Sequence, residues 1–198
     1  MNFLAHAWLS FQHPEITVGN VISDFIKGKK QYDYSPGIQK GIRLHRAIDE
    51  FTDTHPATKK LKEFFRPDYR LYAGAFSDVV YDYFLANDKN EFSSASALKD
   101  FGAFVYAIIE GHLNELPVGF QRLFPYMKSQ DWLYNYQEQW LIEKSFLGLE
   151  RRATYLQETG IAFKLFHENI EAMRPYYVSF FPELKVFAAH KLQELLNG

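Results

Sequence analysis

The chain has 198 residues, no cysteine and a formal net charge of −2. The lack of cysteine excludes disulfides, thiolate nucleophiles and zinc–thiolate sites, and the near-neutral charge gives no reason to expect a nucleic acid or an anionic membrane as partner. With 47% hydrophobic and 18% aromatic residues and no linker, the sequence predicts a single domain over residues 1–198. The first residues resemble neither a membrane span nor a signal peptide, so we expect a cytoplasmic protein.

Helix start and stop signals predict an all-α fold. A helix is expected from 14 to 27, with Gly28 as its terminating glycine. Ser35 and Pro36 are typical of a helix N-terminus and predict a helix to about Thr52. Further helices are expected at 56–65, at 69–86 after a capping Asp68, and at 94–114, 129–149, 154–177 and 182–196.

The segment 116–128 is rich in helix-breaking residues and is expected to be a loop with at most a short turn of helix. It contains Pro117, Gly119 and Pro125. Together the expected elements predict one compact bundle of about seven to nine helices.

Four apolar segments of the first 82 residues carry two polar side chains four residues apart, and therefore on one helix face. The pairs are Asn2 with His6, Asn20 with Asp24, His45 with Asp49, and Asp78 with Asp82. Asp53, four residues beyond Asp49, could extend the third pair. Burying an ionised carboxylate costs on the order of several kcal/mol unless it is paired or metal-bound. The pattern therefore predicts a buried polar site that needs a divalent cation or a nearby arginine such as Arg43 or Arg46.

Most of these residues also have a structural interpretation. The alternatives are a core hydrogen bond for His6, a backbone anchor for Asn20, an ion pair with Lys27 for Asp24, a helix end for Asp53, and buried salt bridges for Asp78 and Asp82. His45 with Asp49 is the pair for which we favour metal binding or catalysis, because a neutral imidazole and a carboxylate on one face suit a divalent ion.

Carboxylate and imidazole ligands without thiolate suit Mn²⁺, Mg²⁺ or Fe²⁺ better than a structural zinc. Such an ion polarises a phosphoryl oxygen and lowers the pKa of a bound water. The sequence has no glycine-rich phosphate loop, no Gly-x-Ser-x-Gly motif and no dinucleotide fingerprint. Hydrolysis at phosphorus is therefore the reaction that this set of residues favours most directly.

Several motifs resemble those of the acyl carrier protein phosphodiesterases. They are NFLAH at 2–6, GNVISDFIKG at 19–28, GIRLHRAIDEFTDTHP at 41–56, SDVVYDYFLA at 77–86, DWLYNY at 131–136 and LGLERR at 147–152. The resemblance implies a helical fold related to the HD-domain phosphohydrolases and usually Mn²⁺-dependent activity. It also implies a reaction, the hydrolysis of the phosphodiester that joins 4′-phosphopantetheine to a serine of holo-acyl carrier protein.

The family motifs imply the site residues. The catalytic set is Asp24, His45, Arg46, Asp49, Asp78 and Asp82, of which Asp24, His45, Asp49 and Asp78 are expected to bind the metal. Supporting roles are expected for Asn2, His6, Asn20, Asp53 and Tyr83. Family members often carry histidine where this chain has Tyr83, so position 83 is either a supporting one or a sign of altered activity. Trp140 also stands where a smaller residue is expected.

Basic residues gather between positions 27 and 46. The basic cluster comprises Lys27, Lys29, Lys30 and Arg43, with Lys40 and Arg46 beside them. It could be an ordinary solvated surface or an anion-docking site. Because carrier proteins are acidic beside the modified serine, the resemblance implies that this cluster binds the carrier. Two other functions stay open: a metal-dependent phosphohydrolase acting on a nucleotide or another small phosphodiester, and a non-catalytic module that binds carrier protein.

Overall fold

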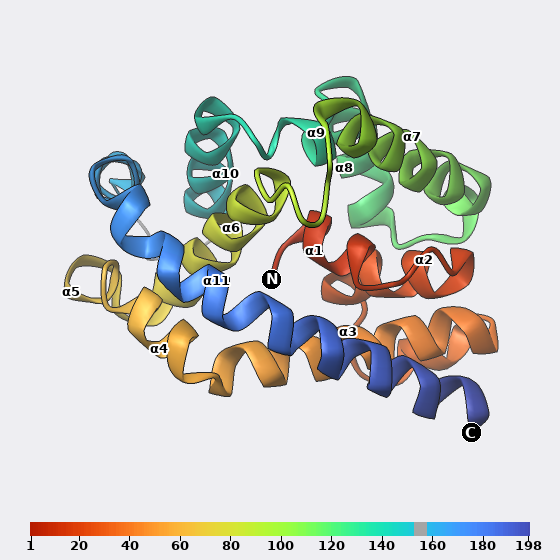
Figure 1. Ribbon diagram of the computed structural model, residues 1–198. Coiled ribbons are helices and arrows are strands. Elements are labelled where there is room, and N and C mark those ends of the chain that lie inside the picture. Colours follow the sequence, from red (N-terminus) through yellow and green to blue (C-terminus); the bar gives the residue numbers. More distant parts are fainter. Residues whose placement is uncertain (153–157) are drawn as a thin grey trace.

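The computed structural model describes residues 1–152 and 158–198, and all regular structure in these ranges is helical (Figure 1). The α-helices are α1 (Phe3–Trp8), α2 (Pro14–Ile22), α3 (Pro36–Thr54), α4 (Pro56–Lys62), α5 (Arg66–Tyr69), α6 (Ala73–Ala86), α7 (Ala95–His112), α8 (Val118–Ser129), α9 (Trp132–Asn135), α10 (Gln139–Arg152) and α11 (Thr159–Asn197). Short 3-10 helices occupy Ser23–Phe25, Gly28–Asp33, Arg70–Tyr72 and Leu113–Glu115. Eight of the described α-helices have seven residues or more, which confirms the predicted all-α bundle.

Helices α2 and α3 pack in backbone contact, and this contact positions the polar pairs of the sequence. A Cβ atom on Gly19 would lie 2.1 Å from the carbonyl oxygen of Ile38, and one on Gly41 would lie 2.4 Å from that of Ile16. Only glycine allows so close an approach. The crossing places Asn20 of α2 against the middle of α3. As predicted, α3 begins after Ser35, whose hydroxyl accepts the amide hydrogen of Ile38.

Helix α11 runs beside α3 and α4 for much of its length (Figure 1). Two helices were expected here, at 154–177 and 182–196. In the structure two helical segments meet at a kink at Asn169 and together form the 39-residue α11, so the break lies earlier in the chain than expected, and the expected start at Thr154 lies outside the described residues. Pro182 does not end the helix. Its neighbours Phe181 and Leu184 are buried in the core, and this burial offsets the missing backbone hydrogen bond.

The prediction of a loop at 116–128 was wrong, because most of the segment is helix α8. Phe120, Phe124 and Met127 are four and three residues apart and are buried on one face. This helical periodicity is a stronger signal than Pro125, which lies inside the helix.

Three other boundaries also differ from the prediction. The expected helix at 14–27 ends at Ile22, so Asp24 lies on the following 3-10 turn. The expected helix at 129–149 is divided into α9 and α10. Asp68 lies within the short α5, and α6 begins only at Ala73. None of the described helices combines the length and the apolar character that a membrane crossing requires.

Candidate metal centre

The first three polar pairs of the sequence meet where α1, α2 and α3 come together. His6 lies on α1, and His45 and Asp49 lie one turn apart on α3. One ligand atom from each of these three residues lies within 4.8 Å of the others. Both imidazoles are buried, and their rings stack with centroids 3.8 Å apart. We refer to His6, His45 and Asp49 as the histidine–aspartate cluster.

Asp49 joins the two histidines. Its Oδ1 lies 3.2 Å from Nε2 of His6, and its Oδ2 lies 3.0 Å from Nε2 of His45. Asp24 reaches the cluster from the 3-10 turn, with Oδ1 3.2 Å from Nε2 of His45. The Asp24 side chain is 73% exposed, so the cluster is open to solvent on this side.

Asn20 contacts the opposite nitrogen of each ring. Its side-chain Oδ1 lies 2.8 Å from Nδ1 of His6, and its backbone oxygen lies 2.7 Å from Nδ1 of His45. These contacts orient both Nε2 atoms toward Asp49. Metal-binding histidines typically have such a partner on the nitrogen that does not bind the ion.

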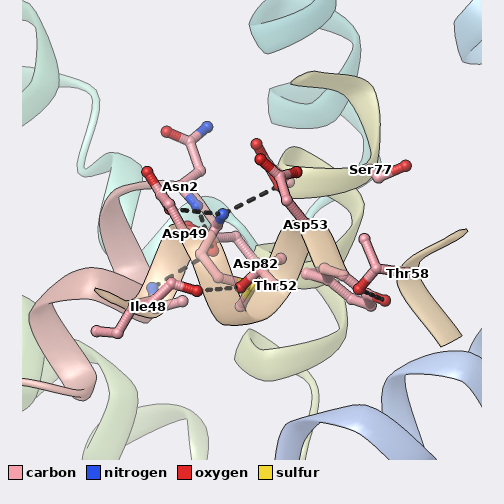
Figure 2. A network of polar contacts seen from close by, with 12 residues as sticks. Asn2, Ile48, Asp49, Thr52, Asp53, Thr58, Ser77 and Asp82 are labelled. Carbon is pink, nitrogen blue, oxygen red and sulfur yellow. Dashed lines mark hydrogen bonds and ion pairs between the residues drawn. The ribbon is translucent and has the colours of Figure 1, made fainter. Parts of the chain in front are cut away.

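The fourth pair, Asp78 with Asp82, lies on α6 and contacts the start of the chain. Figure 2 shows Asp82 beside Asn2. The α-amino group of Met1 lies 3.0 Å from Oδ1 of Asp78 and 3.5 Å from Oδ1 of Asp49. Asp82 is fully buried and accepts hydrogen bonds from backbone N–H groups of α1, including that of Leu4 at 2.7 Å. The structure therefore places Asp82 as the cap of α1, and Asp78 between this cap and the cluster.

The α-amino group of Met1 is a site component that the sequence reasoning missed. Burial opposes its charge, but the carboxylates of Asp78 and Asp49 raise its pKa to about 10. Burial raises the pKa of Asp82 to about 7, although this ammonium group and the backbone amides favour the ionised form. No side-chain motif could have revealed this contact, since it depends on the backbone terminus.

The two histidines have opposite pKa shifts although their rings stack. Burial, followed by repulsion from His45, lowers the pKa of His6 to about 4. Burial also disfavours the charged form of His45, but its hydrogen bonds with Asp24 and Asp49 raise its pKa to about 9. The pKa of Asp49 lies well below its ordinary value, because the attraction of both histidines outweighs its burial. The cluster therefore combines a carboxylate, a neutral imidazole and an imidazolium.

The donor atoms of the cluster fit a divalent cation. Within the described part of the chain, Nε2 of His6 is the buried side-chain nitrogen that has no hydrogen-bond partner. Buried polar atoms of native proteins almost always have a partner, and those without one call for an explanation such as an ion. Two imidazole nitrogens and a carboxylate form a ligand set that first-row divalent metals accept.

Comparison with known proteins places the chain in a family. A family model described as acyl carrier protein phosphodiesterase matches residues 1–184. The chain belongs to the acyl carrier protein phosphodiesterase family. The family predicted from the sequence motifs, and with it the hydrolase class, is thereby confirmed.

Curated members of the family align along nearly the whole chain. The acyl carrier protein phosphodiesterases of Yersinia pestis and Yersinia enterocolitica are each 32% identical over 191 residues, which is 96% of this chain and 99% of the relative. The protein of the same name from Photorhabdus laumondii is 30% identical over 191 residues, 96% of each chain. No solved structure matches the chain, so the relation to HD-domain phosphohydrolases stays a prediction.

Some residues that the family motifs imply lie outside the histidine–aspartate cluster. Asp53 pairs with Lys62 at 2.7 Å on the surface, and exposed Arg46 donates to Gln31. The ring of Tyr83 packs edge-to-face against Phe166 of α11, with centroids 5.1 Å apart. A side chain at position 83 therefore contacts α11, so tyrosine here removes no ligand from the cluster that the structure describes.

A cavity of about 700 Å³ lies beside the site, between the start of α1 and helices α6, α8, α9 and α10. Asn2 and Val79, which line it, directly follow Met1 and Asp78. The other walls are largely aromatic and apolar, as with Trp132 and Leu123, and Lys144 and Arg151 add positive charge. The volume is within the range of about 300–1,000 Å³ that is typical of ligand pockets.

Sequence reasoning missed this cavity, because its residues come from five helices. Trp140 is not among its lining residues.

Proposed function

We propose that this chain is a metal-dependent phosphodiesterase that removes 4′-phosphopantetheine from the serine of holo-acyl carrier protein. Water adds to phosphorus, the bond between phosphorus and the serine oxygen breaks, and that oxygen takes up a proton. The products are 4′-phosphopantetheine and the apo-carrier protein. The observation that supports this proposal most strongly is the histidine–aspartate cluster, with its buried and unpartnered His6 nitrogen, in a chain of this family.

Nε2 of His6, Nε2 of His45 and a carboxylate oxygen of Asp49 would hold the cation, with Asp78 as a further ligand nearby. Asp24, which the sequence predicted as a ligand, is assigned to proton transfer instead. We favour Mn²⁺, which the family resemblance implies. Mg²⁺, which prefers oxygen ligands, and Fe²⁺, which imidazole also suits, are the alternatives. When bound, such an ion supplies a polarised phosphoryl oxygen and an acidified water.

Asp24 is our candidate for the general base. Its carboxylate combines contact with His45 and exposure to solvent, and it is more exposed than the carboxylates of Asp49 and Asp78, so it is the best placed to meet a water. The hydrogen bond with His45 is the main cause that lowers the pKa of Asp24. This keeps Asp24 ionised and therefore able to accept a proton.

The cavity beside the cluster is the place that we propose for the pantetheine arm. It begins next to Met1 and Asp78 and has apolar walls that suit an arm with few charged groups. An arm in this cavity would leave the phosphodiester near the cluster.

The carrier protein itself would dock on the basic cluster. Lys27, Lys29, Lys30 and Arg43 are all exposed, and they lie on the 3-10 segments and on α3, the elements that also carry Asp24 and His45. Positive charge beside the site would attract an acidic carrier and raise its rate of association. A cytoplasmic location is part of the same proposal.

Mass spectrometry of the carrier tests this function. Purified protein is incubated with holo-acyl carrier protein, with and without Mn²⁺. We expect loss of the phosphopantetheine mass only with metal, and no loss with an Asp24→Asn variant. Asp100→Asn is the matched control, because Asp100 is an exposed residue of α7. A carrier that keeps its full mass under Mn²⁺, Mg²⁺ and Fe²⁺ would refute the proposal.

A further inference from the structure

We propose that Asn20 is a positioning residue that, held by Ser10, fixes the tautomer of His6 with its side chain and the ring orientation of His45 with its backbone. Nε2 of His6 then presents a lone pair, and Nε2 of His45 is aimed at the same point, where a cation would take the place of its proton. The inference deepens the proposed function, since it concerns the readiness of that site for a cation.

The orientation of the Asn20 amide follows from its neighbours. Asn20 and Ser10 are both fully buried. Nδ2 of Asn20 lies 2.8 Å from the carbonyl oxygen of His6 and 3.0 Å from Oγ of Ser10. The Ser10 hydroxyl donates to the same carbonyl oxygen at 2.8 Å, so its oxygen is left to accept from Asn20. A flipped amide would place Oδ1 against the carbonyl oxygen, and the two would repel.

The amide orientation then determines the tautomer of His6. Oδ1 of Asn20 carries no hydrogen, so Nδ1 of His6 must be the donor across the 2.8 Å that separate them. A neutral imidazole has only one N–H group, and therefore Nε2 of His6 bears a lone pair. This is the buried nitrogen without a hydrogen-bond partner, and it lies 3.2 Å from a carboxylate oxygen of Asp49. Two electron-rich atoms at this distance favour a cation near both.

The backbone of Asn20 orients the ring of His45. A carbonyl oxygen can only accept, so Nδ1 of His45 donates to it at 2.7 Å. The neighbouring Gly19 makes this contact possible, because its lack of a side chain brings the α2 backbone against α3. One residue thus orients two stacked rings from two different helices.

Asn20 contacts His6 through its side chain and His45 through its backbone, and this difference provides an internal control. Replacing the Asn20 side chain should release His6 but leave the backbone contact with His45. A residue that merely supports packing would not separate the two histidines in this way.

Nitrogen-15 NMR of the histidine rings in the full-length, metal-free protein tests the inference. In the wild-type protein we expect His6 to be protonated on Nδ1 and not on Nε2. In Asn20→Leu, His6 should change its tautomer or become a mixture, while His45 keeps its Nδ1–H. Ser10→Ala should have a smaller effect of the same kind, because the amide loses one anchor but keeps its oxygen.

Calorimetric titration with Mn²⁺ alone provides the second readout. Loss of such an outer partner typically weakens metal binding by about 10–100-fold, and we expect this for Asn20→Leu. Thr17→Ala is the matched control, since Thr17 is buried on the same helix but donates within it, to His13. Its affinity for Mn²⁺ and its histidine tautomers should equal those of the wild type.

A His6 ring protonated on Nε2 in the wild-type protein would overturn the inference, and so would an Asn20→Leu variant with unchanged His6 tautomer and unchanged Mn²⁺ affinity. If Asn20→Leu fails to fold, the wild-type spectrum and the Ser10→Ala variant still test the inference. The expected tautomers in a protein that hydrolyses no carrier would support this inference while refuting the proposed function.

Discussion

The two sides of the site differ in how they are built. The histidine–aspartate cluster is polar, is formed by α1–α3 and is held by contacts between residues at most 43 positions apart in the chain. The cavity is mainly apolar and draws on α6, α8, α9 and α10 as well as the start of α1. The groups that we assign to the chemistry therefore come from local motifs, whereas the space that we assign to the substrate depends on how distant helices pack. Substitutions in the cluster should therefore affect metal binding and catalysis, and substitutions in the cavity should affect substrate binding.

The largest effect is expected from the cluster. Asp49→Asn removes the charge that joins both histidines, and we expect kcat/KM for holo-carrier protein to fall by about 100-fold or more, the scale on which loss of one key electrostatic group acts. Mass spectrometry of the carrier over time gives the rate, and Asp100→Asn is the control. Activity of Asp49→Asn within about twofold of the wild type would show that the chemistry lies elsewhere.

Metal binding should also stabilise the fold. Free Mn²⁺ at 100 times its dissociation constant would add about 2.7 kcal/mol to the free energy of unfolding. For a chain of this length that corresponds to a rise of roughly 5–10 °C in Tm. Thermal melts of chelator-treated protein with and without Mn²⁺ measure the rise. Asp49→Asn should abolish it, and an equal rise in the variant would contradict the assignment of the cluster.

A substitution in the cavity should change substrate binding alone. Ser145 lines the cavity and is only partly exposed, so Ser145→Trp would fill space that we assign to the pantetheine arm. We expect KM for holo-carrier protein to rise by about tenfold, within the range known for altered pockets, with unchanged Mn²⁺ affinity. Ser179→Trp, on an exposed position of α11, is the matched control. Equal kinetics for both variants would remove the cavity from the substrate path.

The smallest effect is expected at the docking surface. Reversing Lys29 and Lys30 to glutamate should raise KM by about threefold at low salt, because charges at the edge of an interface act mainly on association. The effect should shrink near physiological ionic strength, where screening acts over about 8 Å. Lys59 and Lys60, exposed neighbours on α4, provide a matched double reversal. The same loss in both variants would indicate a nonspecific charge effect.

Sequence reasoning predicted the polar half of the site better than the apolar half. Residues four apart on a helix share a face wherever the helix lies, so His45 with Asp49 could be recognised without knowing the fold. The convergence of His6 on this pair could not, since it depends on the close α2–α3 crossing at Gly19 and Gly41.

Two of the errors in the predicted fold have a common cause. Pro125 and Pro182 were given more weight than the buried aromatic residues around them, and both lie within helices. Tertiary burial outweighs the local cost of a proline where apolar residues recur at helical spacing. The role of position 83 likewise depends on tertiary packing. Its neighbour Asp82 faces α1, but one residue further along α6 the side chain faces α11.

Anomalous diffraction from crystals grown with Mn²⁺ tests the central claim most directly. We predict a peak within about 2.0–2.3 Å of Nε2 of His6, of Nε2 of His45 and of a carboxylate oxygen of Asp49, the distances usual for such ligands. A saturated protein with no peak at these three residues, or with its only peak at another site, would contradict the assignment of the histidine–aspartate cluster as the metal centre.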